Sequence, residues 1–140
     1  MGRSKLRIAS ASGSVTDRRH GFADLAKNED VHFIVGDWMS EYNMTTRGGS
    51  KVGSNGSSEE FETSFLEAFL PALPHLASRK IKVAVNAGAS DTKKLYDIVV
   101  KEIDSRGLNI NVAWIGGDEV FDIVKEAFNH GSKFKSLTTG

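Results

Sequence analysis

The sequence contains no cysteine and no long apolar run, and each absence excludes a class of protein. Without cysteine there can be no disulfide, no thiolate nucleophile and no cysteine-ligated metal. No apolar stretch approaches the roughly 20 residues that span a bilayer. Residues 1–10, MGRSKLRIAS, also lack the apolar core of a secretory signal. We therefore expect a cytoplasmic protein with no membrane partner.

The chain also lacks an excess of charge of either sign, because 18 basic residues balance 18 acidic ones. No basic stripe is present, which argues against nucleic acid as a partner. The chain has neither H-E-x-x-H nor a glycine-rich dinucleotide or P-loop motif. We accordingly predict no resident metal, and the sequence identifies no cofactor.

Short β-branched runs alternate with amphipathic helical stripes, which is typical of an α/β protein. We predict a single domain over residues 1–140, built on an open parallel sheet of four strands with helices on both faces, in a Rossmann-like three-layer arrangement. The favoured strand order is 2-1-3-4, with 3-2-1-4 as the alternative. The predicted strands lie near residues 5–10, 31–36, 81–86 and 109–115.

The helical segments carry local signals of their own. Pro71 and Pro74 interrupt an apolar stripe that starts at Phe61, which predicts a break near residue 70. Asp17 is a candidate helix cap, as is either Asp91 or Ser90 further along. The glycine- and serine-rich residues 48–58 show no periodicity and predict a flexible polar loop.

Each predicted strand ends in a turn of small, polar residues, and parallel strands bring such turns to one edge of the sheet. Glycines in these turns could let backbone amides approach an anionic ligand at a helix N-terminus. Alternatively, they only permit tight turns. We predict as ligand-binding residues Ser12, Gly13, Gly88, Gly116 and Gly117.

Three polar side chains at the same edge are the predicted catalytic residues: Asp37, Asn86 and Asp118. The two carboxylates could act as acid and base or hold Mg²⁺, whereas the competing interpretation of Asp118 and Glu119 is helix capping. Glu41 follows Asp37 at helical spacing. Asn86 could stabilise an oxyanion, or it could lock its own turn.

Four stretches, taken in order along the chain, resemble the acyclic terpene utilisation family. They are RIASASG at 7–13, VGDWMSEYNMT at 35–45, KVAVNAGASD at 82–91 and VAWIGGDEV at 112–120. The resemblance implies an α/β domain with a role in isoprenoid or branched acyl-CoA breakdown, as a hydratase or lyase acting on an acyl-CoA. Many members of the family have a second glycine where Ala89 stands here.

Members of that family are several times longer, so the resemblance covers only their N-terminal region. The alternative it leaves open is a non-catalytic truncated fragment or interaction domain without activity of its own. A missing C-terminal region or a second copy of the chain would then be its partner.

Overall fold

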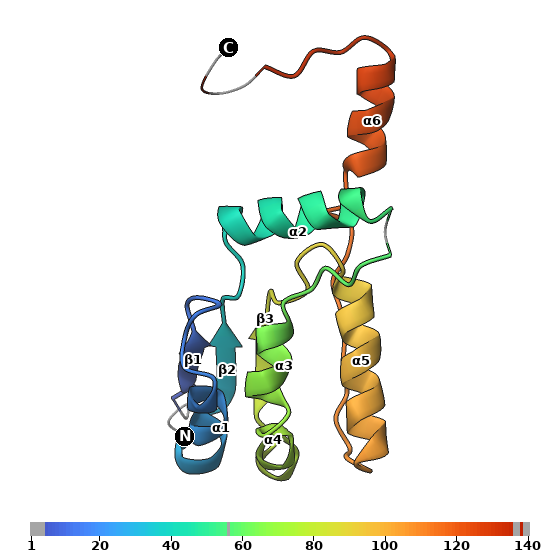
Figure 1. The fold of residues 1–140 in the computed structure, drawn as a ribbon. Coiled ribbons are helices and arrows are strands. Elements are labelled where there is room, and N and C mark those ends of the chain that lie inside the picture. Colours follow the sequence, from blue (N-terminus) through green and yellow to red (C-terminus); the bar gives the residue numbers. More distant parts are fainter. Residues whose placement is uncertain (1–4, 56, 136–137, 139–140) are drawn as a thin grey trace.

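The computed structural model describes residues 5–55, 57–135 and 138. These residues form an α/β fold with a three-stranded sheet (Figure 1). The strands are β1 (Ile8–Ser12), β2 (Phe33–Gly36) and β3 (Lys82–Val85). The helices are α1 (His20–Asn28), α2 (Glu41–Gly53), α3 (Thr63–Phe69), α4 (Leu73–Arg79), α5 (Thr92–Ser105) and α6 (Phe121–Asn129).

The sheet is parallel with the order β1-β2-β3. The favoured order 2-1-3-4 was therefore wrong, because it placed the first strand in the centre. The three observed strands follow the 3-2-1 part of the alternative order. The central position of β2 fits its composition, since Ile34 is fully buried and pairs with Ala9 on one side and Val83 on the other.

The predicted fourth strand at residues 109–115 is not formed in the described part of the chain. Ile110 and Val112 pack against the core. Trp114 and Ile115 are 45% and 90% exposed, respectively. The apolar run therefore reaches the core at two positions, but none of its residues pairs with a neighbouring strand in the described part of the chain.

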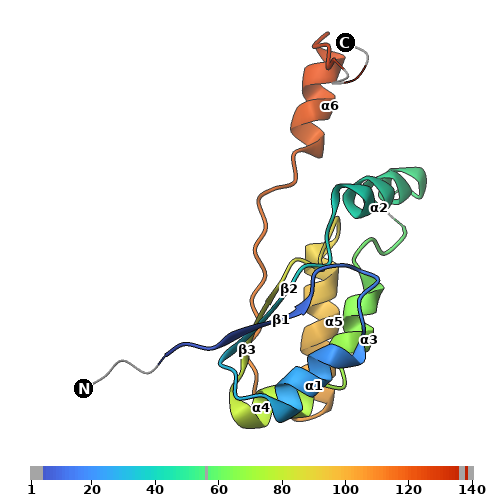
Figure 2. The ribbon, with the colours of Figure 1, turned by 90° about the vertical axis from the view of Figure 1, so that its left-hand side faces the viewer.

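The helices that pack on the sheet, α1, α3, α4 and α5, lie on one face, and α6 stands apart (Figure 2). The prediction of helices on both faces was therefore wrong for the described residues, which form two layers. The strand order explains why. In the order β1-β2-β3, each new strand is added on the same side of the one before it. Because crossovers between parallel strands are right-handed, the helices of both connections then lie on the same face of the sheet.

The core between sheet and helices is centred on four aromatic rings. Phe65 lies edge-on to Trp38, with ring centroids 5.2 Å apart, and stacks on Phe69 at 4.9 Å. Phe22 from α1 contacts all three of these rings. The predicted break near residue 70 is confirmed, since α3 ends at Phe69 and α4 begins at Leu73.

Helix α2 corrects the prediction of a loop at residues 48–58, because residues 48–53 are helical. The Ser40 side chain caps this helix by accepting a hydrogen bond from the Asn43 amide at 3.2 Å. Beyond the helix, the Ser54 and Ser58 hydroxyls lie 2.6 Å apart. Gly56 lies outside the described residues, and the flexibility of this segment stays a prediction.

The predicted cap of α1 was wrong, and the predicted cap of α5 is right in its position but not in its hydrogen bond. Asp17 lies outside α1 and accepts from the Gly13 amide instead. Asp91 holds the N-cap position of α5, but its side chain makes no capping hydrogen bond, and neither does Ser90. Just before this helix, Ala89 has a φ of 45°. That is the left-handed region, where glycine is favoured.

Candidate functional site

The predicted site residues that the structure brings together lie where β1, β2 and β3 end. The Asp37 amide donates to the Ser12 carbonyl at 2.8 Å, which joins the first two turns. The Asn86 Nδ2 donates to Asp37 Oδ1 at 2.6 Å, and Asn86 Oδ1 accepts from the Trp38 amide at 2.7 Å. One asparagine thus connects the turn after β3 to the turn after β2.

The side chain of Asn86 locks the neighbouring turn after β2 and not its own turn, whereas its predicted role towards an oxyanion stays a prediction. A side-chain amide carries two N–H groups, and only one of those of Asn86 is engaged by Asp37. The residue is exposed, so its second N–H can donate to a ligand. Asn86 therefore positions Asp37 and retains a donor beside it.

Asp37 is held in its ionised form by its surroundings. The hydrogen bond from Asn86 and then the one from the Met39 amide lower the pKa of Asp37 below its ordinary value of 3.8, with desolvation opposing them weakly. A carboxyl group with a lowered pKa is a poor general acid near neutral pH. Because it stays ionised, Asp37 is instead suited to accept a hydrogen bond or a proton from a water molecule.

The lowered pKa predicts a pH dependence of stability. Because the folded pKa lies below the unfolded one, Asp37 stabilises the fold above its unfolded pKa, and this contribution is lost as the pH falls through the folded pKa. Asn86→Ala should raise the Asp37 pKa towards 3.8 and so reduce the stability that is lost as the pH falls from about 5 through the folded pKa. A ¹³C NMR titration of the Asp37 carboxyl measures the pKa directly.

Ser78→Ala is the control for this titration, since Ser78 lies on α4 and bonds only to the His75 carbonyl. It should leave the Asp37 pKa unchanged. A pKa in Asn86→Ala equal to that of the unaltered protein would show that the hydrogen bond is not the cause of the shift.

The two glycines predicted to offer amides are both occupied by the fold. The Gly13 amide donates to Asp17 Oδ2 at 2.8 Å, so a ligand would have to displace Asp17 to reach it. Gly88 is buried, and a Cβ there would stand 2.7 Å from the Thr92 Cα. At Gly88 the absence of a side chain is therefore needed for close packing against the first turn of α5.

Gly116, Gly117 and Asp118 are not brought to this edge in the structure. No hydrogen bond or ion pair among the described residues joins them to the turns after β1, β2 and β3. Their neighbour Glu119 accepts from the Phe121 amide at 3.0 Å, which agrees with the helix-capping interpretation for that residue. Its other carboxylate oxygen lies 3.9 Å from Lys51 Nζ of α2.

A shallow cavity of about 600 Å³ opens beside Asp37. Its lining includes Gly13, Ser40 and Glu41. The remaining wall is formed by Met39 and Met44, which the sequence analysis did not single out. Methionine side chains are flexible and adapt to irregular apolar ligands, so the cavity combines an apolar wall with a carboxylate-rich rim.

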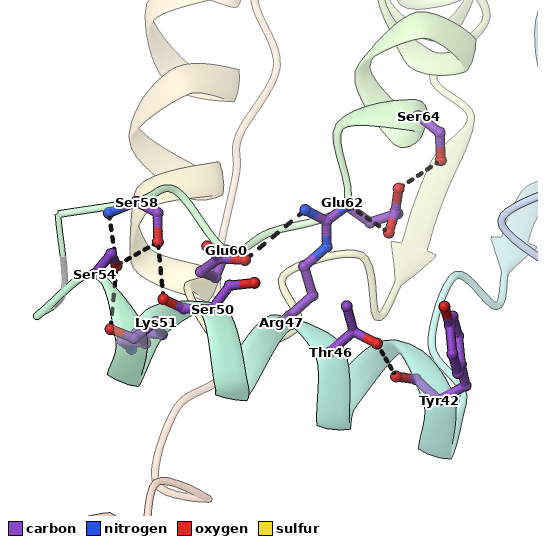
Figure 3. Close-up of polar contacts among 10 residues, drawn as sticks. All are labelled: Tyr42, Thr46, Arg47, Ser50, Lys51, Ser54, Ser58, Glu60, Glu62 and Ser64. Atoms are coloured by element: carbon purple, nitrogen blue, oxygen red, sulfur yellow. Dashed lines mark hydrogen bonds and ion pairs between the residues drawn. The ribbon is translucent and has the colours of Figure 1, made fainter.

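Helix α2 lies over this edge of the sheet and is attached to it through polar residues (Figure 1). Its one buried residue is Asn43, which donates to the Trp38 carbonyl at 3.1 Å. One and two turns further on, Arg47 pairs with Glu62 at 3.2 Å, and Lys51 donates to the Ser90 carbonyl at 2.5 Å. Figure 3 shows how Arg47 reaches Glu62 and the buried Glu60 on the segment before α3.

The described residues hold no group of three or more histidine, aspartate or glutamate side chains arranged to bind a metal ion. None of the described helices combines the length and the apolar character needed to cross a bilayer.

One comparison with known proteins identified relatives. The sequence model described as acyclic terpene utilisation family protein AtuA matches residues 6–140. Comparisons with curated proteins and with solved structures gave no match.

Proposed function

Because the chain belongs to the acyclic terpene utilisation family, we propose that it binds an isoprenoid-derived, methyl-branched acyl-CoA in the cytoplasm and takes part in its breakdown as a hydratase or lyase. The observation that carries this proposal is the Asp37–Asn86 pair beside the methionine-lined cavity. The branched acyl chain would lie against Met39 and Met44. The CoA phosphates would lie outside the cavity, because its lining carries two carboxylates and no cation.

The chemistry proposed for this pair is the addition of water to a conjugated thioester. Asp37 accepts a proton from the attacking water, whose oxygen bonds to the β-carbon. The free N–H of Asn86 donates to the thioester oxygen as negative charge develops there. The electrons of the Cα–Cβ double bond move towards the thioester oxygen as the new C–O bond forms, and Asp37 then returns the proton that it took from the water to the α-carbon. The lyase direction is the reverse of these steps.

The test is binding and turnover of a methyl-branched 2-enoyl-CoA, measured by calorimetry and by the loss of absorbance of the conjugated thioester. Asn86→Ala and the isosteric Asp37→Asn should each weaken binding or turnover by about 10–100-fold, the range expected for a hydrogen bond to a charged group. Asp104→Asn makes the same charge change near the end of α5 and should have no effect. Circular dichroism would verify that each variant is folded.

An interaction domain without activity is the second candidate, and the uncovered face of the sheet favours it. The two candidates differ in one measurement. An unaltered protein that binds no branched thioester at about 1 mM would contradict the enzymatic proposal, since that concentration detects even weak binding.

A further inference from the structure

None of the described helices covers the face of the sheet opposite α1, α3, α4 and α5 (Figure 2). By the strand register, Ile8, Phe33 and Lys82 form one row across this face, and Ser10, Val35 and Ala84 form the next. Ile8 is 58% exposed and Val35 is 36% exposed. Parallel sheets are almost always covered on both faces, so an apolar element should pack on these rows.

Helix α6 is the one helix among the described residues with no buried side chain. Its apolar residues recur three and four positions apart, which gathers them into a stripe along one side. All of them are between 42% and 69% exposed: Val120, Phe121, Ile123, Val124 and Phe128. The chain thus carries an unpartnered apolar helix and an unpartnered apolar sheet face.

The two surfaces match in size. Nine residues of α6 span about 13 Å, and strands of four or five residues span about 13–17 Å. Lys82 stands at one border of the open face. Glu126, on the polar side of α6, carries a negative charge that complements the positive charge of Lys82.

The connection between them is long enough for the helix to turn back. After Val112, the last residue of this segment that packs on the core, residues 113–120 are exposed. They include the Gly116-Gly117 pair, with a φ of 112° at Gly117. Within the described part of the chain, the one ion pair or hydrogen bond that joins them to α2 is the exposed pair of Lys51 and Glu119 at 3.9 Å, and exposed pairs of this kind contribute little.

We propose that α6 docks its apolar stripe on the open face of the sheet of its own chain, running antiparallel to the strands. The connection over residues 113–120 explains why α6 should dock on its own sheet in preference to the sheet of a second copy. A short flexible linker holds its segment at an effective concentration of about 1 mM, far above the concentration of a second chain in dilute solution.

Docking would also complete the candidate site, a consequence that rests on the function proposed above. Residues 109–112 run towards the carboxyl edge of the sheet, and α6 would return along the open face (Figure 2). The turn between them would then cross that edge. It contains Gly116, Gly117 and Asp118, the predicted site residues that the undocked arrangement leaves away from Asp37.

The absence of cysteine allows a direct test by engineered cross-linking. In the double variant Val35→Cys with Val124→Cys, both thiols lie on the proposed contact. The matched control is Val35→Cys with Asp122→Cys, which moves the second thiol to the polar side of α6. On mild oxidation, the first variant should form an intramolecular disulfide at least about tenfold faster than the control, because docking raises the local thiol concentration.

Non-reducing electrophoresis and intact mass distinguish the outcomes. Equal rates in the two variants would overturn the docking, and disulfide-linked dimers in place of cross-linked monomers would assign the surface to a second copy. If Val35→Cys impairs folding, Ala84→Cys on the same row replaces it. The cross-link forms without any thioester, so its result stands whether or not the protein binds one.

Discussion

Replacing Phe65 with alanine should lower the free energy of unfolding by about 3–5 kcal/mol, the cost of removing a buried aromatic ring. The ring is 3% exposed and lies between Trp38, Phe69 and Phe22 at the centre of the core. Its removal would leave a cavity bounded by three rings that are themselves packed. Chemical denaturation followed by circular dichroism measures the loss.

Phe134→Ala is the matched control, because it removes the same atoms from a residue that is 58% exposed and lies beyond α6. We expect it to change the free energy of unfolding by less than about 1 kcal/mol, as surface substitutions usually do. Similar losses in the two variants would mean that the aromatic cluster is not the main core.

Gly36→Ala should cost about 1–3 kcal/mol by overpacking. A Cβ at this position would stand 2.1 Å from a carbon of the Trp38 ring. That ring is 2% exposed and contacts Phe22 and Phe65, so it has no space into which to move. Since the Trp38 amide also donates to Asn86, the substitution should disturb the site together with the core.

Gly49→Ala is the comparison for that substitution, because nothing lies within 4 Å of its Cβ position. In a helix, alanine is favoured over glycine by about 0.5–1 kcal/mol, so this variant should be as stable as the unaltered protein or more stable. Thermal or chemical unfolding of both variants measures the difference. A Gly36→Ala protein as stable as Gly49→Ala would show that the Trp38 ring is free to move.

Local sequence signals predicted the α/β class and three of the strands, because β-branched runs and apolar stripes depend only on neighbouring residues. The strand order was not predictable in the same way. It depends on which strand is covered on both sides, and Ile34 in β2 holds that position through contacts with both neighbouring strands.

Composition misled the prediction at α2. Gly48, Gly49 and Gly53 are weak helix formers, so the segment reads as a loop. The helix is stabilised instead by pairing across the chain, chiefly from Arg47 to Glu60 and Glu62. These ion pairs join segments that are separate in the sequence, so the periodicity of the sequence does not predict them.

Only part of the candidate site could be predicted from the sequence, because the argument depends on which segments join the sheet. Parallel strands bring their carboxyl ends to one edge, which predicts the proximity of Asp37 and Asn86 without any knowledge of their hydrogen bond. The same argument fails for Asp118, because residues 109–115 do not join the sheet. The sequence analysis did not predict the methionine wall, because Met39 and Met44 line one cavity only in the folded arrangement in which α2 begins at Glu41, between them.

The order β1-β2-β3 has a consequence for how the chain folds during synthesis. Each strand pairs with the one made just before it, so the sheet can grow in the direction of translation without waiting for a later segment. The connection over residues 13–32 is shorter than that over residues 37–81, and closing the shorter loop costs less entropy. The β1–β2 pair should therefore form first, and β3 should then pair with the free edge of β2.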